Sequence, residues 1–123
     1  MPKPVVAFEI PALPRMTNNS GRTNNHWSDR AKEAKQWQTA VMAMVGSQRP
    51  PSPLSLARLV LTRFSSVPPD PDGLVSGFKH IIDGLVHARV LKDDKWTNIG
   101  MPEYRWEKAP AKKGKVRVEV WLP

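Results

Sequence analysis

The chain has no cysteine among its 123 residues, which excludes disulfide bonds, thiolate metal sites and cysteine nucleophiles. It also has no apolar run near the roughly 18 residues that a membrane-spanning helix needs. The first residues, Met1-Pro2-Lys3-Pro4, lack the apolar core of a secretory signal peptide. These absences predict a cytoplasmic protein that does not contact a membrane.

Two families of ligand-binding motif are missing as well. The seven glycines form neither GxGxxG nor GxxxxGK[ST], so the common loops that cradle nucleotide phosphates are excluded. The three histidines show no HxH or HxxxH spacing, which gives no convincing histidine metal set. A bound metal would therefore have to rely on oxygen ligands.

Size and charge narrow the possible partners. A chain of this length predicts one domain, residues 1–123, so that binding and chemistry must share a surface. The net charge of +8 and the pI near 10.2 are typical of a nucleic-acid-binding protein. A basic protein without such a partner is the alternative that this composition leaves open.

Negative charge is concentrated in one segment of this basic chain. Five of the six aspartates lie within residues 70–94, which contain no glutamate. Against these acids stand Lys79, Arg89 and Lys92, so the segment carries −2 and the remainder +10. Clustered carboxylates oppose folding unless a cation neutralises them, and a hard divalent cation prefers such oxygen ligands. The pattern indicates a metal-dependent enzyme acting on phosphodiesters.

The order of apolar and polar segments predicts an α+β domain of the form β-α-β-α-β-β, with a mixed sheet packed by two helices. Apolar or alternating segments predict strands at residues 5–13, 56–64, from 93 or 95 to 101 with a continuation over 103–108, and 116–122. Apolar residues at helical spacing predict helices at 29–47 and about 72–88. The second strand, second helix and third strand suggest a parallel β-α-β unit.

The second predicted helix presents a chemical face beside its core face. On a helical wheel, Asp72, Lys79 and Asp83 fall within about 40° of one another, away from the apolar residues. Asp70 precedes the helix, and the Asp93-Asp94 pair follows it. If the third strand starts at this pair, three carboxylates could converge: Asp70, Asp72 and one of the pair.

Such a carboxylate set suits Mg²⁺, with Mn²⁺ as a substitute. Mg²⁺ takes oxygen ligands, keeps several waters and bridges to substrate phosphate. It can then polarise the phosphoryl oxygen and generate hydroxide. Lys79 is the candidate for stabilising negative charge that develops on the phosphate.

Structural roles explain each residue separately. Asp70 before Pro71 is a good helix N-cap, and Asp72 in the first turn favours the helix dipole. Asp83 and Lys79 form an ordinary i,i+4 pair, and Asp93-Asp94 could be a simple turn. Together these roles do not explain why acids concentrate here.

The quoted residues resemble the RusA family of Holliday junction resolvases. The matching pattern is an Asp-x-Asp at a helix start, a lysine four residues before a third aspartate, then Gly-Leu and a downstream Asp-Asp. In this chain it reads Asp70-Pro71-Asp72-Gly73-Leu74, Lys79-His80-Ile81-Ile82-Asp83-Gly84-Leu85 and Val90-Leu91-Lys92-Asp93-Asp94. The early Asn18-Asn19 is similar, more loosely, to the N-terminal loop of that family.

This resemblance implies a homodimeric, Mg²⁺-dependent endodeoxyribonuclease that nicks four-way DNA junctions symmetrically. Carried over, the metal ligands are Asp70, Asp72 and Asp94, and the important lysine is Lys79. Asp83 and Asp93 remain supporting or alternative ligands. The chain departs from the family at Gly73, where asparagine is usual, and its spacing from Asp72 to Lys79 is about one helical turn longer.

Candidate DNA contacts lie in the N-terminal part of the chain. They are Asn18, Asn19 and Arg22 in the polar segment 14–26, and Arg30, Lys32 and Lys35 on the outer face of the first predicted helix. Three functions remain open: a junction-resolving nuclease, a related metal nuclease acting on flaps or other branched DNA, and a catalytically silent DNA-binding protein.

Overall fold

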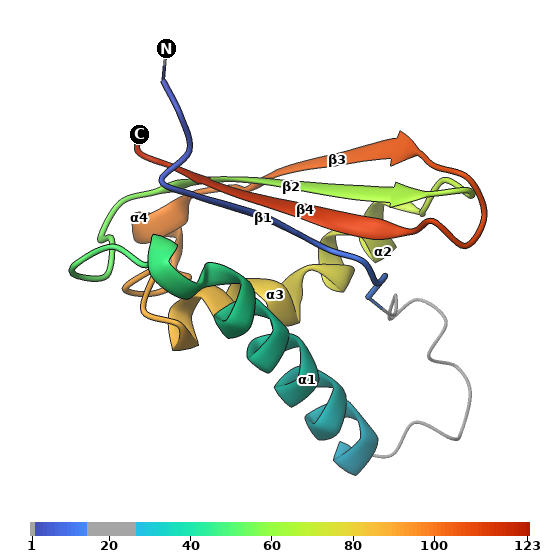
Figure 1. Ribbon diagram of the computed structural model, residues 1–123, viewed down its shortest axis with the longest axis horizontal. Helices are drawn as coiled ribbons and strands as arrows, with labels where there is room; N and C mark the ends of the chain where they lie inside the picture. Colours follow the sequence, from blue (N-terminus) through green and yellow to red (C-terminus); the bar gives the residue numbers. More distant parts are fainter. Residues whose placement is uncertain (1, 15–26) are drawn as a thin grey trace.

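Four strands form one mixed sheet in the order β1-β4-β2-β3, with the long helices on one of its faces (Figure 1). This computed structural model describes residues 2–14 and 27–123. The strands are β1 (Val6–Ile10), β2 (Arg58–Ser65), β3 (Glu103–Lys108) and β4 (Lys115–Trp121). The helices are α1 (Trp27–Val45), α2 (Pro71–Gly77), α3 (Lys79–His87) and α4 (Trp96–Ile99), and a 3₁₀ turn, η2, spans Gly46–Gln48. The predicted α+β class with a mixed sheet is confirmed.

Strand pairing also confirms the parallel β-α-β unit. β4 pairs antiparallel with both β1 and β2, whereas β2 and β3 run parallel. A parallel connection must cross over the sheet, and α2 and α3 supply the crossover. The carboxyl end of β2 therefore leads directly into the Asp70–Asp72 segment.

The core lies between the sheet and its helices. Alternate residues of β1 and β4 are buried, and the buried apolar residues of α1 and α3 belong to the same core cluster. The two helices approach closely at Gly84, where an added Cβ would lie 2.9 Å from Val41 Cβ. The predicted core face of the second helix is confirmed, since Phe78, Ile81 and Leu85 are fully buried.

The single predicted helix at about 72–88 is wrong in one respect, because the segment forms two helices. Phe78 lies between them with φ −92° and ψ 0°, and its N–H donates to the Val75 carbonyl in a tight 3₁₀-type bond. Gly77 packs against Pro14, whose Cγ would lie 3.4 Å from an added Cβ. Gly77, a residue of low helix propensity, is the last residue of α2 and directly precedes the break.

The predicted strand from residue 93 or 95 to 101 is also wrong. Residues 93–95 have no regular secondary structure, and Trp96–Ile99 form α4. Gly100 follows at φ 59° and ψ −150°, a conformation that almost only glycine adopts, and redirects the chain into β3. Only the proposed continuation over 103–108 is a strand, so the β-sheet does not position Asp93 and Asp94.

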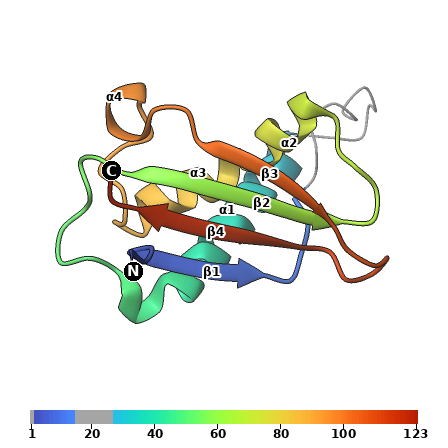
Figure 2. The same cartoon turned by 90° about the horizontal axis from the view of Figure 1, so that it is seen from above.

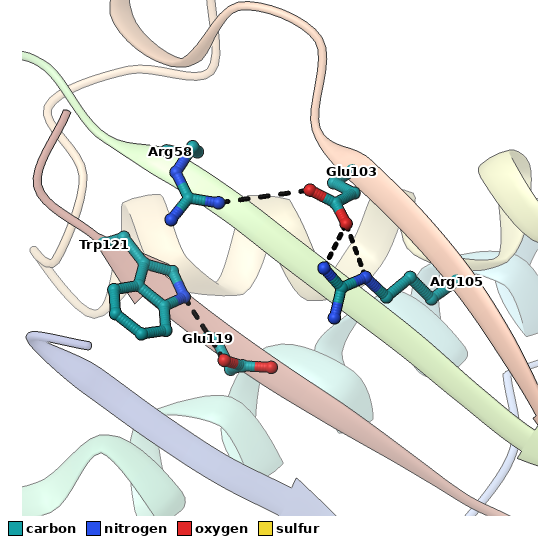
Figure 3. Close-up of polar contacts among 5 residues, drawn as sticks. All are labelled: Arg58, Glu103, Arg105, Glu119 and Trp121. Carbon is teal, nitrogen blue, oxygen red and sulfur yellow. Dashed lines mark hydrogen bonds and ion pairs between the residues drawn. The ribbon is translucent and has the colours of Figure 1, made fainter. Parts of the chain in front are cut away.

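The sheet face opposite the helices carries charged residues in register. Cross-strand partners place four glutamates and four basic residues on this open face, namely Glu9, Glu103, Glu107, Glu119, Arg58, Arg105, Lys115 and Arg117. Glu103 pairs with Arg58 and Arg105, and the Trp121 indole donates to Glu119 (Figure 3). Opposite charges across strands stabilise the pairing and need no further element above them.

Candidate functional site

A groove of about 400 Å³ runs beside α2, α3 and α4, and we call it the α2–α4 groove. Figure 2 shows α2 and α4 on the side of β3, an edge strand of the sheet. Apolar side chains from all three helices and from the start of β3 make most of its wall. Its polar side chains are Ser76, Lys79, Asp83, Asp94 and the Tyr104 hydroxyl. The groove thus brings together two segments that the sequence places apart.

Lys79 and Asp83 stand one turn apart at the start and the middle of α3. Both line the groove, Lys79 is exposed and Asp83 is half-buried. No ion pair joins these two described side chains. The alternative role of Lys79, as half of a surface ion pair with Asp83, is therefore not realised.

Asp93 and Asp94 differ in what they contact. Asp93 Oδ1 accepts the N–H of Asp94 at 2.7 Å, and Asp93 Oδ2 lies 3.7 Å from Lys95 Nζ. The hydrogen bond from the Asp94 backbone, with the nearby Lys95 charge, lowers the pKa of the Asp93 carboxyl. The Asp93 side chain thus bonds the backbone of the segment before α4, while Asp94 lines the groove. That arrangement favours Asp94 as the ligand, which stays a prediction.

Asp70 and Asp72 lie at the opposite end of α2 from the groove residues Val75 and Ser76. Asp70 is the N-cap residue, its carbonyl accepts the Leu74 N–H at 2.9 Å, and its side chain makes no capping hydrogen bond. Asp72 is exposed in the first turn. The predicted position of both residues at a helix start is correct, but neither lines the groove.

The expected convergence of three carboxylates is not present as a closed cluster. Within residues 2–14 and 27–123, no three aspartate, glutamate or histidine side chains stand close enough to hold a metal together. The donor chemistry nonetheless fits Mg²⁺, which binds through one or two carboxylates plus substrate phosphates rather than through a protein cage. The assignment of Asp70, Asp72 and Asp94 as metal ligands stays a prediction.

Arg63 is a residue near this site that sequence reasoning missed. It occupies an inward register position on β2, following Leu59 and Leu61, and only 8% of it is exposed. Its Nη1 donates to the Pro14 carbonyl at 3.1 Å, and burial lowers the pKa of its guanidinium. Arg63 therefore holds Pro14 against β2, next to Gly77 at the end of α2. In the sequence, Arg63 takes the next alternate position after the apolar residues Leu59 and Leu61, and this pattern could have indicated a buried charge.

The predicted DNA-contacting residues fall into two groups. Arg30, Lys32 and Lys35 are exposed on α1, as the helical spacing predicts. Asn18, Asn19 and Arg22 lie outside the described residues. The four acids and four bases of the open sheet face cancel, so the excess charge of +8 belongs to the rest of the chain. A polyanion would be attracted there rather than to the open face.

Comparisons with known proteins add no family assignment. No family model matches the chain. A search of curated proteins also finds no match. Among the described helices, none combines the length and apolar character required to cross a bilayer.

Proposed function

We propose that this protein is a Mg²⁺-dependent endodeoxyribonuclease that acts as a homodimer and resolves four-way DNA junctions by paired, symmetric nicks. The observation that carries the proposal is the meeting of Lys79, Asp83 and Asp94 along one groove, beside the helix that begins with Asp70 and Asp72. An ammonium group among carboxylates in a basic protein is suited to phosphodiester hydrolysis.

The carboxylates and the lysine have separate roles in this proposal. Asp70, Asp72 and Asp94 do not form a closed cluster, so they would have to close around Mg²⁺ together with a substrate phosphate; the bound ion would supply Lewis-acid chemistry at the phosphoryl oxygen. Lys79 lies within the groove without an ion pair to Asp83, so its charge can face a phosphate. Asp83, one turn later on α3, adds a second carboxylate to the groove beside Asp94.

The homodimer follows from the substrate. A four-way junction has pseudo-two-fold symmetry, and two phosphodiesters in related strands must be cut to resolve it. A two-fold enzyme matches this geometry and places one site at each scissile bond. The exposed bases on α1 would contribute phosphate contacts that do not depend on base sequence.

Substitution of each predicted ligand tests the proposal. We expect Asp70→Asn, Asp72→Asn and Asp94→Asn each to abolish junction cleavage, because a lost carboxylate weakens the hold on the metal. Junction binding should stay the same or tighten, because negative charge near phosphate is removed. Gel-shift and cleavage assays on the same protein preparations measure both.

Asp93→Asn is the matched control. An asparagine Oδ1 can still accept the Asp94 N–H, so the local backbone and the cleavage activity should survive. Near-normal cleavage by Asp72→Asn would refute the metal site. An active Asp94→Asn beside an inactive Asp93→Asn would instead show that the first aspartate of the pair is the ligand.

Two alternatives remain distinct from this proposal. A metal nuclease with the same site that acts on flaps would cut branched substrates lacking four arms. A catalytically silent DNA-binding protein would bind junctions with no cleavage under any divalent cation, and its aspartates would only cap and solubilise helices.

A further inference from the structure

The α2–α4 groove carries an apolar surface that the proposed hydrolysis does not use. Trp96 is 71% exposed, Met101 is 69% exposed, and both line the groove. Beneath them the wall continues through Ile82 and Ile99, which are buried. Exposed apolar surface gathered at one concave place is typical of a binding site.

The position of Trp96 relates this surface to the predicted chemistry. Trp96 opens α4 two residues after Asp94, and the groove they share also contains Lys79. An indole ring offers a flat apolar face, and an ammonium offers a partner for an anion. A nucleotide has both complementary parts, because its base has a π-face and its phosphate is negative.

We propose that the α2–α4 groove holds one unstacked nucleobase of a DNA strand, with Trp96 as its stacking platform and Lys79 facing the adjacent phosphate. The choice of DNA as the ligand rests on the proposed function. The groove volume, about 400 Å³, lies within the range of small-ligand sites. A DNA strand suits this groove because the chain carries a net charge of +8 and Lys79 offers a cation to a phosphate beside the stacked base.

Stacking can be measured without cleavage. The probes are a fluorescently labelled single-stranded oligothymidylate and an abasic backbone of equal length, which carries the same phosphates. Binding is followed by anisotropy without divalent metal. We expect the wild-type chain to bind the base-bearing probe about 5- to 150-fold more tightly, as expected for stacking of one base. Trp96→Ala should abolish this preference, and Trp96→Phe should retain most of it.

Trp121→Ala is the matched control, because Trp121 lies on the open sheet face, away from the groove (Figure 3). Its ring centroid is 5.2 Å from Arg58 Cζ. It should leave the preference for bases unchanged. Equal wild-type affinity for both probes, or no binding to either, would overturn the inference. The inference would also be overturned if Trp96→Ala lost the same factor of affinity for the base-bearing probe and for the abasic probe.

Sedimentation of the wild-type chain and of Trp96→Ala tests whether a second copy of the chain, rather than a nucleobase, occupies the groove. If Trp96→Ala changes the sedimentation mass while the preference for bases persists, the groove is a contact between copies and the inference fails. Base preference that depends on Trp96, together with no Mg²⁺-stimulated cleavage of any branched DNA, would support the groove and refute only the nuclease proposal.

Discussion

At the scale of single residues, the aspartates and glutamates of this chain serve different purposes. Glutamates predominate on the open sheet face, where Glu9 accepts hydrogen bonds from Lys115 at 3.1 Å and Arg117 at 2.9 Å. These two bonds hold the pKa of Glu9 below its ordinary value. Aspartates predominate around α2, α3 and the segment before α4, where Asp93 Oδ2 lies 3.7 Å from Lys95 Nζ. Their position beside the groove, away from the paired charges of the open face, makes the aspartates the residues to test for function.

Lys79→Ala tests the role of the groove lysine. We expect the variant to keep its fold, its melting temperature within a few degrees and most of its junction affinity, because Lys79 is exposed and makes no ion pair with Asp83. Cleavage should slow by at least about 100-fold, as expected when one electrostatic contact to a transition state is lost. Single-turnover cleavage of a labelled junction measures this.

Lys92→Ala is the control for the lost charge, because Lys92 is exposed and does not line the groove. It should cleave at the wild-type rate. A decrease of less than about threefold for Lys79→Ala would mean that the longer spacing after Asp72 has carried this lysine away from the chemistry.

At the scale of elements, the segment 93–102 shapes the groove through irregular backbone rather than through a strand. The Asn98 side chain donates to the Ser55 carbonyl at 2.9 Å, and the Ala57 N–H donates to the Asn98 carbonyl at 3.0 Å. These bonds fix α4 against the segment before β2. Gly100 then turns the chain so that Met101 and Pro102 complete the groove wall.

Gly100→Ala should cost stability through backbone strain alone. An added Cβ meets no atom within 4 Å, but φ 59° with ψ −150° is almost inaccessible to alanine. We expect a loss of up to about 3 kcal/mol, measured by urea unfolding. Gly46→Ala is the comparison: its φ is 46°, its Cβ also meets nothing, and it should lose only about 1 kcal/mol. An equal or smaller loss at Gly100 would contradict the assigned conformation.

Local sequence patterns predicted those features that depend on residues near one another in the chain. The spacing of Phe78, Ile81 and Leu85 specified the buried face of α3, and alternation specified β4. Patterns failed where packing between distant residues decides. The break at Phe78 follows Gly77, which packs against the distant Pro14. In the α4 segment, Asn98 bonds the distant Ser55 carbonyl and Gly100 adopts a positive φ.

The candidate site was predicted in part for the same reason. Lys79, Asp83 and Asp94 were selected from their spacing, and they do share a groove. The contribution of Trp96 to that groove required α4, and the inward position of Arg63 required the strand register. Both depend on tertiary structure that the sequence pattern did not reveal.

At the scale of the whole molecule, charge is divided between the two faces of the sheet. The open face is neutral, and its Arg58, Lys115 and Arg117 side chains lie over the aromatic rings of Trp121 and Phe64. The excess of +8 therefore lies elsewhere, including the exposed bases of α1. The molecule is expected to approach DNA with its helices and loops.

Junction affinity should depend steeply on salt. Log K should fall linearly with log[salt], with a slope of roughly −0.9 for each phosphate contacted, because contacts release counterions. Removing Arg30, Lys32 or Lys35 should make the slope shallower. Arg105→Ala, which removes the same charge from the open face, should leave it unchanged. Anisotropy titrations at several salt concentrations measure the slopes, and a flat response for the wild type would exclude nucleic acid as the partner.

Cleavage of a labelled four-way junction with and without Mg²⁺ tests whether the protein is a metal-dependent junction nuclease. With Mg²⁺, the wild-type chain should produce paired nicks at symmetric positions in opposing strands; with EDTA, it should bind the junction without cutting it. Asp70→Asn, purified identically, serves as the control for a contaminating nuclease. An intact junction in Mg²⁺ and in Mn²⁺, bound by the wild-type chain, would contradict the account.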